Sequence, residues 1–141
     1  MINIAYSGTQ QGMNEAQMLA LRGLIPDGAR FHHGDCIGGD SQAHLLAIKA
    51  SCEIYIHPCT IEDKRAYNSG AYRVYLARSP LLRNRVMVEA TDWLIATPFQ
   101  DNEVLRSGTW STIRYAQRYR RLFHSVHRIT HIKRNGTVCE L

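Results

Sequence analysis

The chain has 141 residues, of which 45% are hydrophobic and 21% charged, and its formal net charge is +5. That is about one domain of ~100–150 residues, long enough to bury a core without disulfides or a structural metal, so we expect a single domain over residues 1–141. No apolar run approaches the ~18 residues that span a bilayer, and the first residues show no basic segment before an apolar stretch, so we expect no membrane association and a cytoplasmic location.

Short apolar runs alternate with amphipathic segments, a pattern typical of an α/β domain with a parallel sheet. At the end of the chain, an Asn135-Gly136 pair between two strand-like segments predicts a hairpin. We therefore expect a mostly parallel sheet of about five strands with a C-terminal hairpin. The expected strands are 2–6, 30–33, 53–57 and 93–96, and the expected helices are about 14–25, 38–50, 80–90 and 110–122.

Residues 60–78 interrupt this alternation with a polar and aromatic segment. A long irregular connection in a compact domain is usually functional or mobile. We expect this segment to close over a ligand, with a contribution from Tyr67, Tyr72 or Arg73.

Three breaks share one composition, in which a strand is followed by glycine with small hydroxyl or acidic residues and then by a helix. Because the carboxyl ends of parallel strands meet at one edge, these residues are expected where open α/β sheets bind ligands. Helix N-termini present free N–H groups that suit phosphate, and glycine allows close backbone approach. Each break taken alone is also typical of an ordinary cap or turn. The breaks are Ser7-Gly8-Thr9, Gly34-Asp35 through Gly38-Gly39-Asp40, and Ser107-Gly108-Thr109.

The sequence contains none of the fingerprints GxGxxG, GxxxxGK[ST] and GxSxG. A different resemblance is carried by six segments in order: YSGT at 6–9, HHGDCIGGD at 32–40, HP at 57–58, LRNRVMV at 82–88, LIATP at 94–98 and LRSGTW at 105–110. Together they resemble the SLOG superfamily, the Rossmann-like proteins that include the LOG-type nucleotide phosphoribohydrolases and the DNA-processing protein. The resemblance implies a Rossmann-like three-layer sandwich whose sheet edge binds a nucleotide or a nucleotide-derived ligand.

The resemblance also implies which residues contact the ligand. It places a phosphate at the helix N-terminus formed by Ser107, Gly108 and Thr109, and an arginine-containing motif at Arg83 and Asn84. The guanidinium fork of Arg83 matches phosphate oxygens, although a helical arginine also forms surface salt bridges. The other implied contacts come from the first two breaks: Ser7, Gly8, Thr9, Gly34, Asp35, Gly39 and Asp40.

The sequence departs from the LOG-type enzymes at the position of their catalytic glutamate. Those enzymes resemble one another in a PGGxGTxxE motif, whereas Thr112 stands at the Glu position here. A threonine does not act as a carboxylate base near neutral pH. The remaining candidate carboxylates are Asp35, Asp40 and Glu89. Asp40 also suits a helix cap, and Asp35 a bond to a ribose hydroxyl.

Two further features have simple interpretations. The four cysteines form no CxxC pair and are expected to be free thiols. His32, His33, Cys36, His57 and Cys59 fall near strand ends without a standard zinc spacing, so we expect no metal, and we expect no cofactor. Trp110 is suited either to core packing or to stacking on a base.

These features favour a protein that senses or sequesters a nucleotide-like small molecule, such as an NAD-derived or cyclic nucleotide signal. We expect a homo-oligomer, formed through the helix at 80–90 or the terminal hairpin. By analogy with SLOG sensors in bacterial antiviral systems, the resemblance implies a role in antiviral signalling or phage counter-defence. The enzymatic alternative is LOG-like hydrolysis of a nucleotide N-glycosidic bond. A second alternative is nucleic-acid binding by the basic C-terminal third, which contains Arg114, Arg118, Arg120, Arg121, Arg128, Lys133 and Arg134.

Overall fold

The computed structural model describes residues 1–125 and 127–141, and its strands form one seven-stranded sheet in the order β4-β3-β2-β1-β5-β6-β7. Strands β1 to β6 are parallel, and β7 is antiparallel to β6. The expected mostly parallel sheet with a C-terminal hairpin is therefore confirmed. The strands are β1 (Asn3–Gly8), β2 (Arg30–His33), β3 (Glu53–Ile56), β4 (Arg73–Val74), β5 (Trp93–Thr97), β6 (Arg128–Ile132) and β7 (Val138–Glu140).

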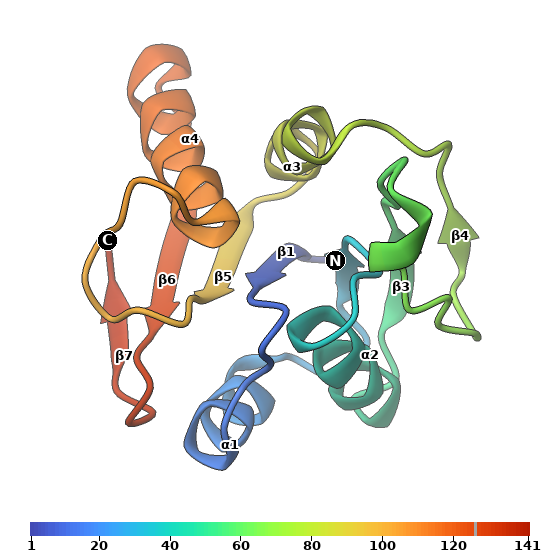
Figure 1. Ribbon diagram of the computed structural model, residues 1–141. Coiled ribbons are helices and arrows are strands. Elements are labelled where there is room, and N and C mark those ends of the chain that lie inside the picture. Colours follow the sequence, from blue (N-terminus) through green and yellow to red (C-terminus); the bar gives the residue numbers. More distant parts are fainter. Residues whose placement is uncertain (126) are drawn as a thin grey trace.

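Helices cover both faces of the sheet, which gives the three layers of a Rossmann-like sandwich (Figure 1). Helices α1 and α2 pack on one face, and α3 and α4 pack on the other. Within the described residues, no helix is long and apolar enough to cross a membrane. The helices are α1 (Glu15–Leu24), α2 (Gly39–Lys49), α3 (Pro80–Glu89) and α4 (Gly108–Phe123).

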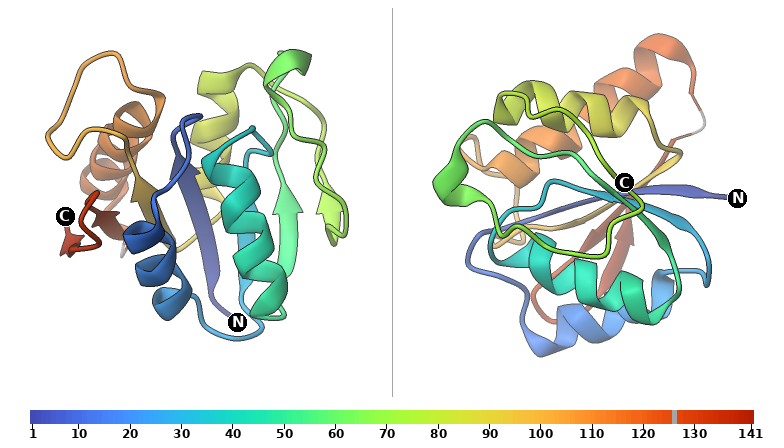
Figure 2. Two further views of the ribbon diagram at one scale, coloured as in Figure 1. Left: turned by 60° about the horizontal axis from the view of Figure 1, so that its bottom comes forward. Right: turned by 90° about the vertical axis from the view of Figure 1, so that its right-hand side faces the viewer.

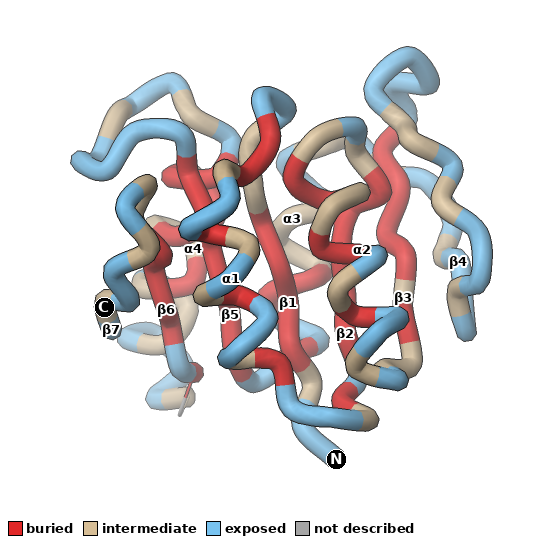
Figure 3. Tube along the Cα trace, turned by 90° about the horizontal axis from the view of Figure 1, so that it is seen from below, coloured by how far each residue is buried: buried red, intermediate tan, exposed pale blue. Residues whose placement is uncertain are grey.

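Successive side chains of the central strands point alternately into two apolar cores, one on each face of the sheet. Along β1, Ile4 and Tyr6 belong to the core under α1 and α2, whereas Ala5 belongs to the core under α3 and α4. Figure 3 shows buried residues along β1, β2 and β5, and exposed residues on the outer sides of α1 and α2. Burial on both faces explains why these strands have continuous apolar sequences.

The strand order reverses beside β1, and this reversal positions the site. From β1 the chain proceeds through β2 and β3 to β4 on one side, and it then returns to β5 and β6 on the other side. In open α/β sheets, such a reversal opens a crevice outside the carboxyl ends of the strands. Strand β1 extends through Gly8, beyond the predicted end at Tyr6, and Gly8 pairs with Thr97 at the end of β5. The loops that follow the strands gather at this edge (Figure 2, left).

Side-chain caps start two of the helices. Asn14 caps α1 by accepting a hydrogen bond from the Gln17 N–H, and the Gln17 side chain accepts one from the Asn14 N–H. This capping box explains the helix start that the sequence predicts. Ser107 caps α4 by accepting from the Trp110 N–H, so α4 begins at Gly108, two residues before the predicted start.

Residues 60–78 form the edge of the sheet instead of a wholly irregular connection. A short 3₁₀ turn spans Glu62–Lys64, and β4 pairs in parallel with β3. Side-chain contacts hold β4 against β3, because the rings of Tyr72 and Tyr75 both pack against Tyr55. The sequence does not predict β4, and the sheet has seven strands where about five were expected.

A chain of buried histidines links β2 to α2. The Asp35 N–H donates to Nδ1 of His33, which fixes the proton of neutral His33 on Nε2. That Nε2 lies 2.9 Å from Nδ1 of His44, and Nε2 of His44 lies 2.7 Å from the Ser69 carbonyl oxygen. These hydrogen bonds form only when the imidazole rings of His33 and His44 are both neutral. Burial, followed by the neighbouring His44, lowers the pKa of His33 well below its ordinary value.

A second histidine pair joins β2 to the end of β3, through His32, whose side chain alternates with that of His33. Nδ1 of His32 is 2.8 Å from Nε2 of His57, and the two rings stack between Tyr55 and Tyr75. Burial lowers the pKa of His32 to about 4 and the pKa of His57 to about 3. Both pairs therefore place neutral imidazole inside the protein.

Candidate functional site

The crevice at the strand reversal is a cleft of about 390 Å³. This volume lies within the ~300–1,000 Å³ of typical small-molecule sites. The loops after β1, β2 and β5 contribute to it, together with the first turns of α3 and α4. The cleft is lined by Tyr6, Ser7, Gly8, Thr9, Gln10, Gln11, Gly34, Cys36, Asp40, Cys59, Lys64, Pro80, Arg83, Asn84, Met87, Phe99, Gln100, Arg106, Ser107, Gly108 and Thr109.

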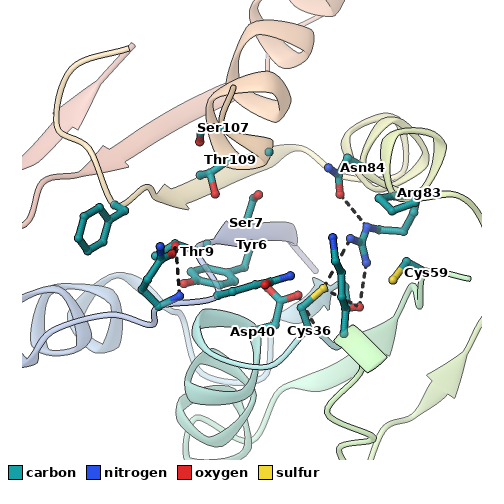
Figure 4. A pocket seen from close by; sticks show the side chains of 18 of the residues that line it. Tyr6, Ser7, Thr9, Cys36, Asp40, Cys59, Arg83, Asn84, Ser107 and Thr109 are labelled. Carbon is teal, nitrogen blue, oxygen red and sulfur yellow. Dashed lines mark hydrogen bonds between the residues drawn. The ribbon is translucent and has the colours of Figure 1, made fainter. Parts of the chain in front are cut away.

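The residues predicted from the three breaks and the arginine motif converge on this cleft. All of them line it except Asp35 and Gly39. In Figure 4, Ser107 and Thr109 of α4 lie on one side, Asp40 and Cys36 on the opposite side, and Arg83 and Asn84 at one end. The parallel topology thus gathers segments that are about 100 residues apart in sequence.

Several of the predicted glycines are required for packing. A Cβ at Gly8 or at Gly39 would collide with the hydroxyl of Tyr6, which is hydrogen-bonded to Thr97 beneath the cleft. A Cβ at Gly34 would collide with the guanidinium of Arg83. These glycines therefore allow a tyrosine and an arginine to approach the backbone closely. Gly39 has this packing role and lies outside the cleft lining.

Arg83 is a buried cation that faces the cleft without a carboxylate partner. Its side chain enters from α3, is only 6% exposed, and donates from Nη1 to the carbonyls of Gly34 at 2.8 Å and His57 at 3.0 Å. Its Nε donates to Oδ1 of Asn84 at 2.7 Å. Among the described residues it has no ion pair, so the surface salt bridge left open by the sequence does not form. Neutral acceptors orient the guanidinium, and the nearby Asp40 carboxylate makes no direct ion pair with it, which leaves donors for an anionic ligand.

The first turn of α4 supplies a second anion-binding feature on the opposite side. The Ser107 hydroxyl accepts from Trp110 N–H, whereas Gly108 and Thr109 are the first two residues of the helix, where N–H groups have no partner within the helix. A Cβ built at Gly108 meets no atom within 4 Å, and Gly108 itself lines the cleft. Thr109 points into the cleft in Figure 4.

The charge of the cleft is mainly positive. Lys64 and Arg106 line it together with Arg83, and Asp40 is the one carboxylate among its described lining residues. Burial raises the pKa of Asp40 to about 6, although nearby Arg83 acts in the opposite direction. Oδ2 of Asp40 accepts from the Cys36 N–H at 3.0 Å, so this carboxylate also fixes the loop before α2. The excess of cations and helix N-termini favours an anion.

The other candidate carboxylates lie elsewhere. Asp35 has a φ of 58° and is fully buried, and its carboxylate accepts from Arg65 at 2.9 Å and from both the backbone and the side chain of Asn68. With a further bond from Arg65 Nε at 3.2 Å, the carboxylate accepts four hydrogen bonds, all from the segment after β3. Glu89 is exposed near the end of α3 and does not line the cleft. At the position of the LOG-type glutamate, the Thr112 hydroxyl donates to the Gly108 carbonyl.

The segment after β3 contributes Lys64 to the cleft, a residue that the sequence reasoning did not select. The three side chains predicted to contribute, Tyr67, Tyr72 and Arg73, lie outside the lining. The Tyr67 ring packs on Arg65, with the guanidinium 4.3 Å from the ring centre. The contribution of this segment is therefore a cation rather than an aromatic side chain.

Trp110 packs in the core instead of facing a base. The indole is 7% exposed, lies among the apolar residues under α4, and donates from Nε1 to the Gln100 carbonyl at 3.0 Å. The aromatic ring that does face the cleft is Phe99, which sequence reasoning missed together with Gln10, Gln11, Gln100 and Arg106. The one sequence feature that indicates a place for Phe99 at the sheet edge is its position two residues after the end of β5.

The cleft thiols are poor candidates for a nucleophile or a metal site. Burial, followed by nearby Asp40, raises the pKa of Cys36 to about 11, which disfavours the thiolate. The Cys59 Sγ is buried and lies 3.6 Å from the Ile61 carbonyl oxygen. Across residues 1–125 and 127–141, no group of three or more His, Cys, Asp and Glu side chains is placed to bind a metal ion.

Several cations of the basic C-terminal third make contacts within the chain. Arg114 pairs with Glu103 at 2.9 Å, and Arg128 pairs with Glu140 at 2.8 Å. Arg120 donates to the Leu141 carbonyl, and Arg134 donates to the Gly12 carbonyl. These contacts leave fewer cations for a continuous nucleic-acid surface than the sequence count suggests.

Comparison of the chain with protein-family models gives no match, and comparison with curated proteins gives none either. The functional assignment therefore depends on the residues of the cleft.

Proposed function

We propose that the cleft binds a nucleotide or a nucleotide-derived molecule through its phosphate, and that the protein acts as a receptor or sequestering protein for it. The carrying observation is the buried Arg83, whose charge has no carboxylate partner, in the same cleft as the first turn of α4. A buried cation without a direct ion pair is stabilised by an anionic ligand, and Arg83, Lys64 and Arg106 outnumber the single lining carboxylate Asp40. An NAD-derived or cyclic nucleotide signal has the required charge.

The remaining lining supports a nucleotide over inorganic phosphate alone. A cleft of about 390 Å³ is large enough for more than a single phosphate group. Its polar side chains include Thr9, Asn84 and Ser7, which suit the hydroxyls of a ribose. Phe99 adds an exposed aromatic ring.

Binding without hydrolysis is favoured by the geometry around α4. The hydroxyl of Thr112, where LOG-type enzymes have glutamate, is hydrogen-bonded to the helix backbone. A carboxylate is thus missing from the position at which the resemblance implies the catalytic base. A role in antiviral signalling is supported only by the resemblance of the sequence to the SLOG superfamily.

Replacing Gly108 by alanine tests the phosphate position. The added Cβ meets no protein atom within 4 Å, so we expect an unchanged or slightly higher melting temperature. In the complex the same Cβ would occupy the space that a phosphate needs, so the affinity for AMP or ADP-ribose should fall about tenfold, as for loss of one charge-assisted hydrogen bond of ~1.5 kcal/mol or more. Isothermal titration calorimetry measures this affinity.

Gly23→Ala is the matched control, because Gly23 is also helical and its added Cβ is also free of contacts. It should leave the affinity unchanged. Equal affinities of the Gly108→Ala variant and the unaltered protein would show that the phosphate does not bind at the N-terminus of α4.

One observation supports the alternative of N-glycosidic hydrolysis: Asp40 lies in the cleft and burial raises its pKa to about 6. Such a carboxyl group is suited to donate a proton to a leaving base near neutral pH. If the protein is an N-glycosidase, AMP incubated with it releases adenine, and Asp40→Asn lowers that rate at least ~100-fold. Intact AMP after prolonged incubation, together with measurable binding, would end this alternative.

A further inference from the structure

We propose that Phe99 is the platform on which the ligand stacks a planar base, so that the cleft selects nucleotides over sugar phosphates. This inference rests on the proposed function and assigns the part of the site that does not contact phosphate.

Phe99 is an exposed ring that is supported from behind. It lines the cleft, is 44% exposed, and has the Arg134 guanidinium 4.9 Å from its ring centre. Arg134 is fixed in turn, because its Nη1 donates to the Gly12 carbonyl and to the Gln17 side chain, each at 3.1 Å, and its backbone N–H donates to Asp101 at 2.8 Å. The ring therefore has one covered face, while its open surface borders the cleft.

The strand register places this ring opposite the loop after β1. Gly8 pairs with Thr97, so the chain continues from neighbouring strand ends to Gln10 on one side and Phe99 on the other. Gln10 and Gln100 are exposed and line the same cleft as Phe99. Their side-chain amides are the kind of group that donates to and accepts from the edge of a base.

Phe99 differs from the other large apolar side chains that could serve this purpose. Tyr6 lines the cleft but is fully buried, with its hydroxyl bonded to Thr97. Leu105 is on the same loop and is more exposed than Phe99, but it lies outside the cleft lining. Within the part of the chain that the structure describes, Phe99 is thus the aromatic ring with an accessible surface inside the cleft.

The test compares the binding of AMP and ribose 5-phosphate to the unaltered protein, Phe99→Ala and Phe99→Trp. Loss of base–aromatic stacking should weaken AMP binding by the Phe99→Ala variant about 5- to 100-fold and leave its affinity for ribose 5-phosphate unchanged. Phe99→Trp retains an aromatic face and should bind AMP within a few-fold of the unaltered protein. Phe123→Ala removes an exposed phenylalanine at the far end of α4 and is the control, with no change for either probe.

Two results would overturn the platform while sparing the phosphate site: unaltered protein that binds ribose 5-phosphate as tightly as AMP, or a Phe99→Ala variant that binds AMP normally. Equal loss of both probes in that variant would also overturn it, because stacking affects only the probe with a base. If the unaltered protein binds neither probe, the proposed function fails, and the platform fails with it.

Discussion

Replacing Arg83 by methionine is expected to weaken AMP binding by at least ~30-fold, the effect of removing one member of a buried, hydrogen-bonded charge pair. Methionine retains the length and apolar stem of arginine but removes the donors to Gly34 and His57 and the charge that faces the cleft. Arg83→Lys keeps the charge without the planar fork, so its affinity for AMP should lie between those of the unaltered protein and the Arg83→Met variant. Calorimetric titration gives the affinities, and thermal unfolding checks the fold of each variant.

Arg85→Met is the matched control, since Arg85 lies on the same helix but faces the outer groove between α3 and α4, beside Tyr115. It should bind AMP normally. An Arg83→Met variant that folds and binds AMP as the unaltered protein does would show that Arg83 does not bind the phosphate. If only Arg85→Met loses binding of a nucleic acid at low salt, the basic surface is the functional one.

Stability is expected to fall steeply as the pH decreases from about 6.5 to about 4. His32, His33 and His57 have folded-state pKa values below their ordinary value of 6.5, so in this range the unfolded chain takes up protons that the folded protein does not. Each such histidine lowers the free energy of unfolding by about 1.4 kcal/mol per pH unit.

Asp40 opposes this trend, because its folded-state pKa is raised to about 6. A raised carboxyl pKa gives stability that is present at low pH and lost as the pH rises from its ordinary value of 3.8 through 6. Between about pH 4 and pH 6, unfolding therefore takes up protons on several buried histidines, with smaller contributions from His127 and His131, and releases one from Asp40. The histidines outnumber Asp40, so the free energy of unfolding should decrease with falling pH, and urea unfolding across this range measures the slope.

Variants separate the two contributions. Asp40→Asn should steepen the slope by about 1.4 kcal/mol per pH unit, and His57→Phe should flatten it by a similar amount while preserving the stack on Tyr75. His124→Asn is the control, because His124 is exposed at the end of α4 and has a left-handed backbone that asparagine tolerates. A stability that stays constant from pH 6.5 to pH 4.5 would contradict the neutral buried histidines.

Most of the fold follows from local sequence patterns. The apolar runs of β1, β2, β3 and β5 and the Asn14 cap of α1 are local signals, and each element forms within a few residues of its predicted position. Strand β4 has no such signal, because Arg73 and Val74 are both exposed. β4 pairs with β3 through contacts such as Tyr72 with Tyr55, and more than 15 residues separate the two strands in sequence.

The candidate site divides in the same way. The glycine breaks and Arg83 could be placed at the sheet edge because parallel topology puts every strand end there. Asp35 could not be separated from Asp40, because its carboxylate is taken by Arg65 and Asn68, some 30 residues away. Trp110 shares a helix face with Ile113 and Ala116, a spacing that favours the core, whereas Phe99 occurs in a loop without periodicity.

Mapping of amide chemical shifts during titration with AMP shows both whether a nucleotide binds and where it binds. We expect saturable shifts at 7–11, 34–40 and 99–109, absent in the Arg83→Met variant. No shifts at millimolar AMP, or shifts confined to the outer groove at Arg85 and Arg118, would contradict the proposed binding of a nucleotide in the cleft.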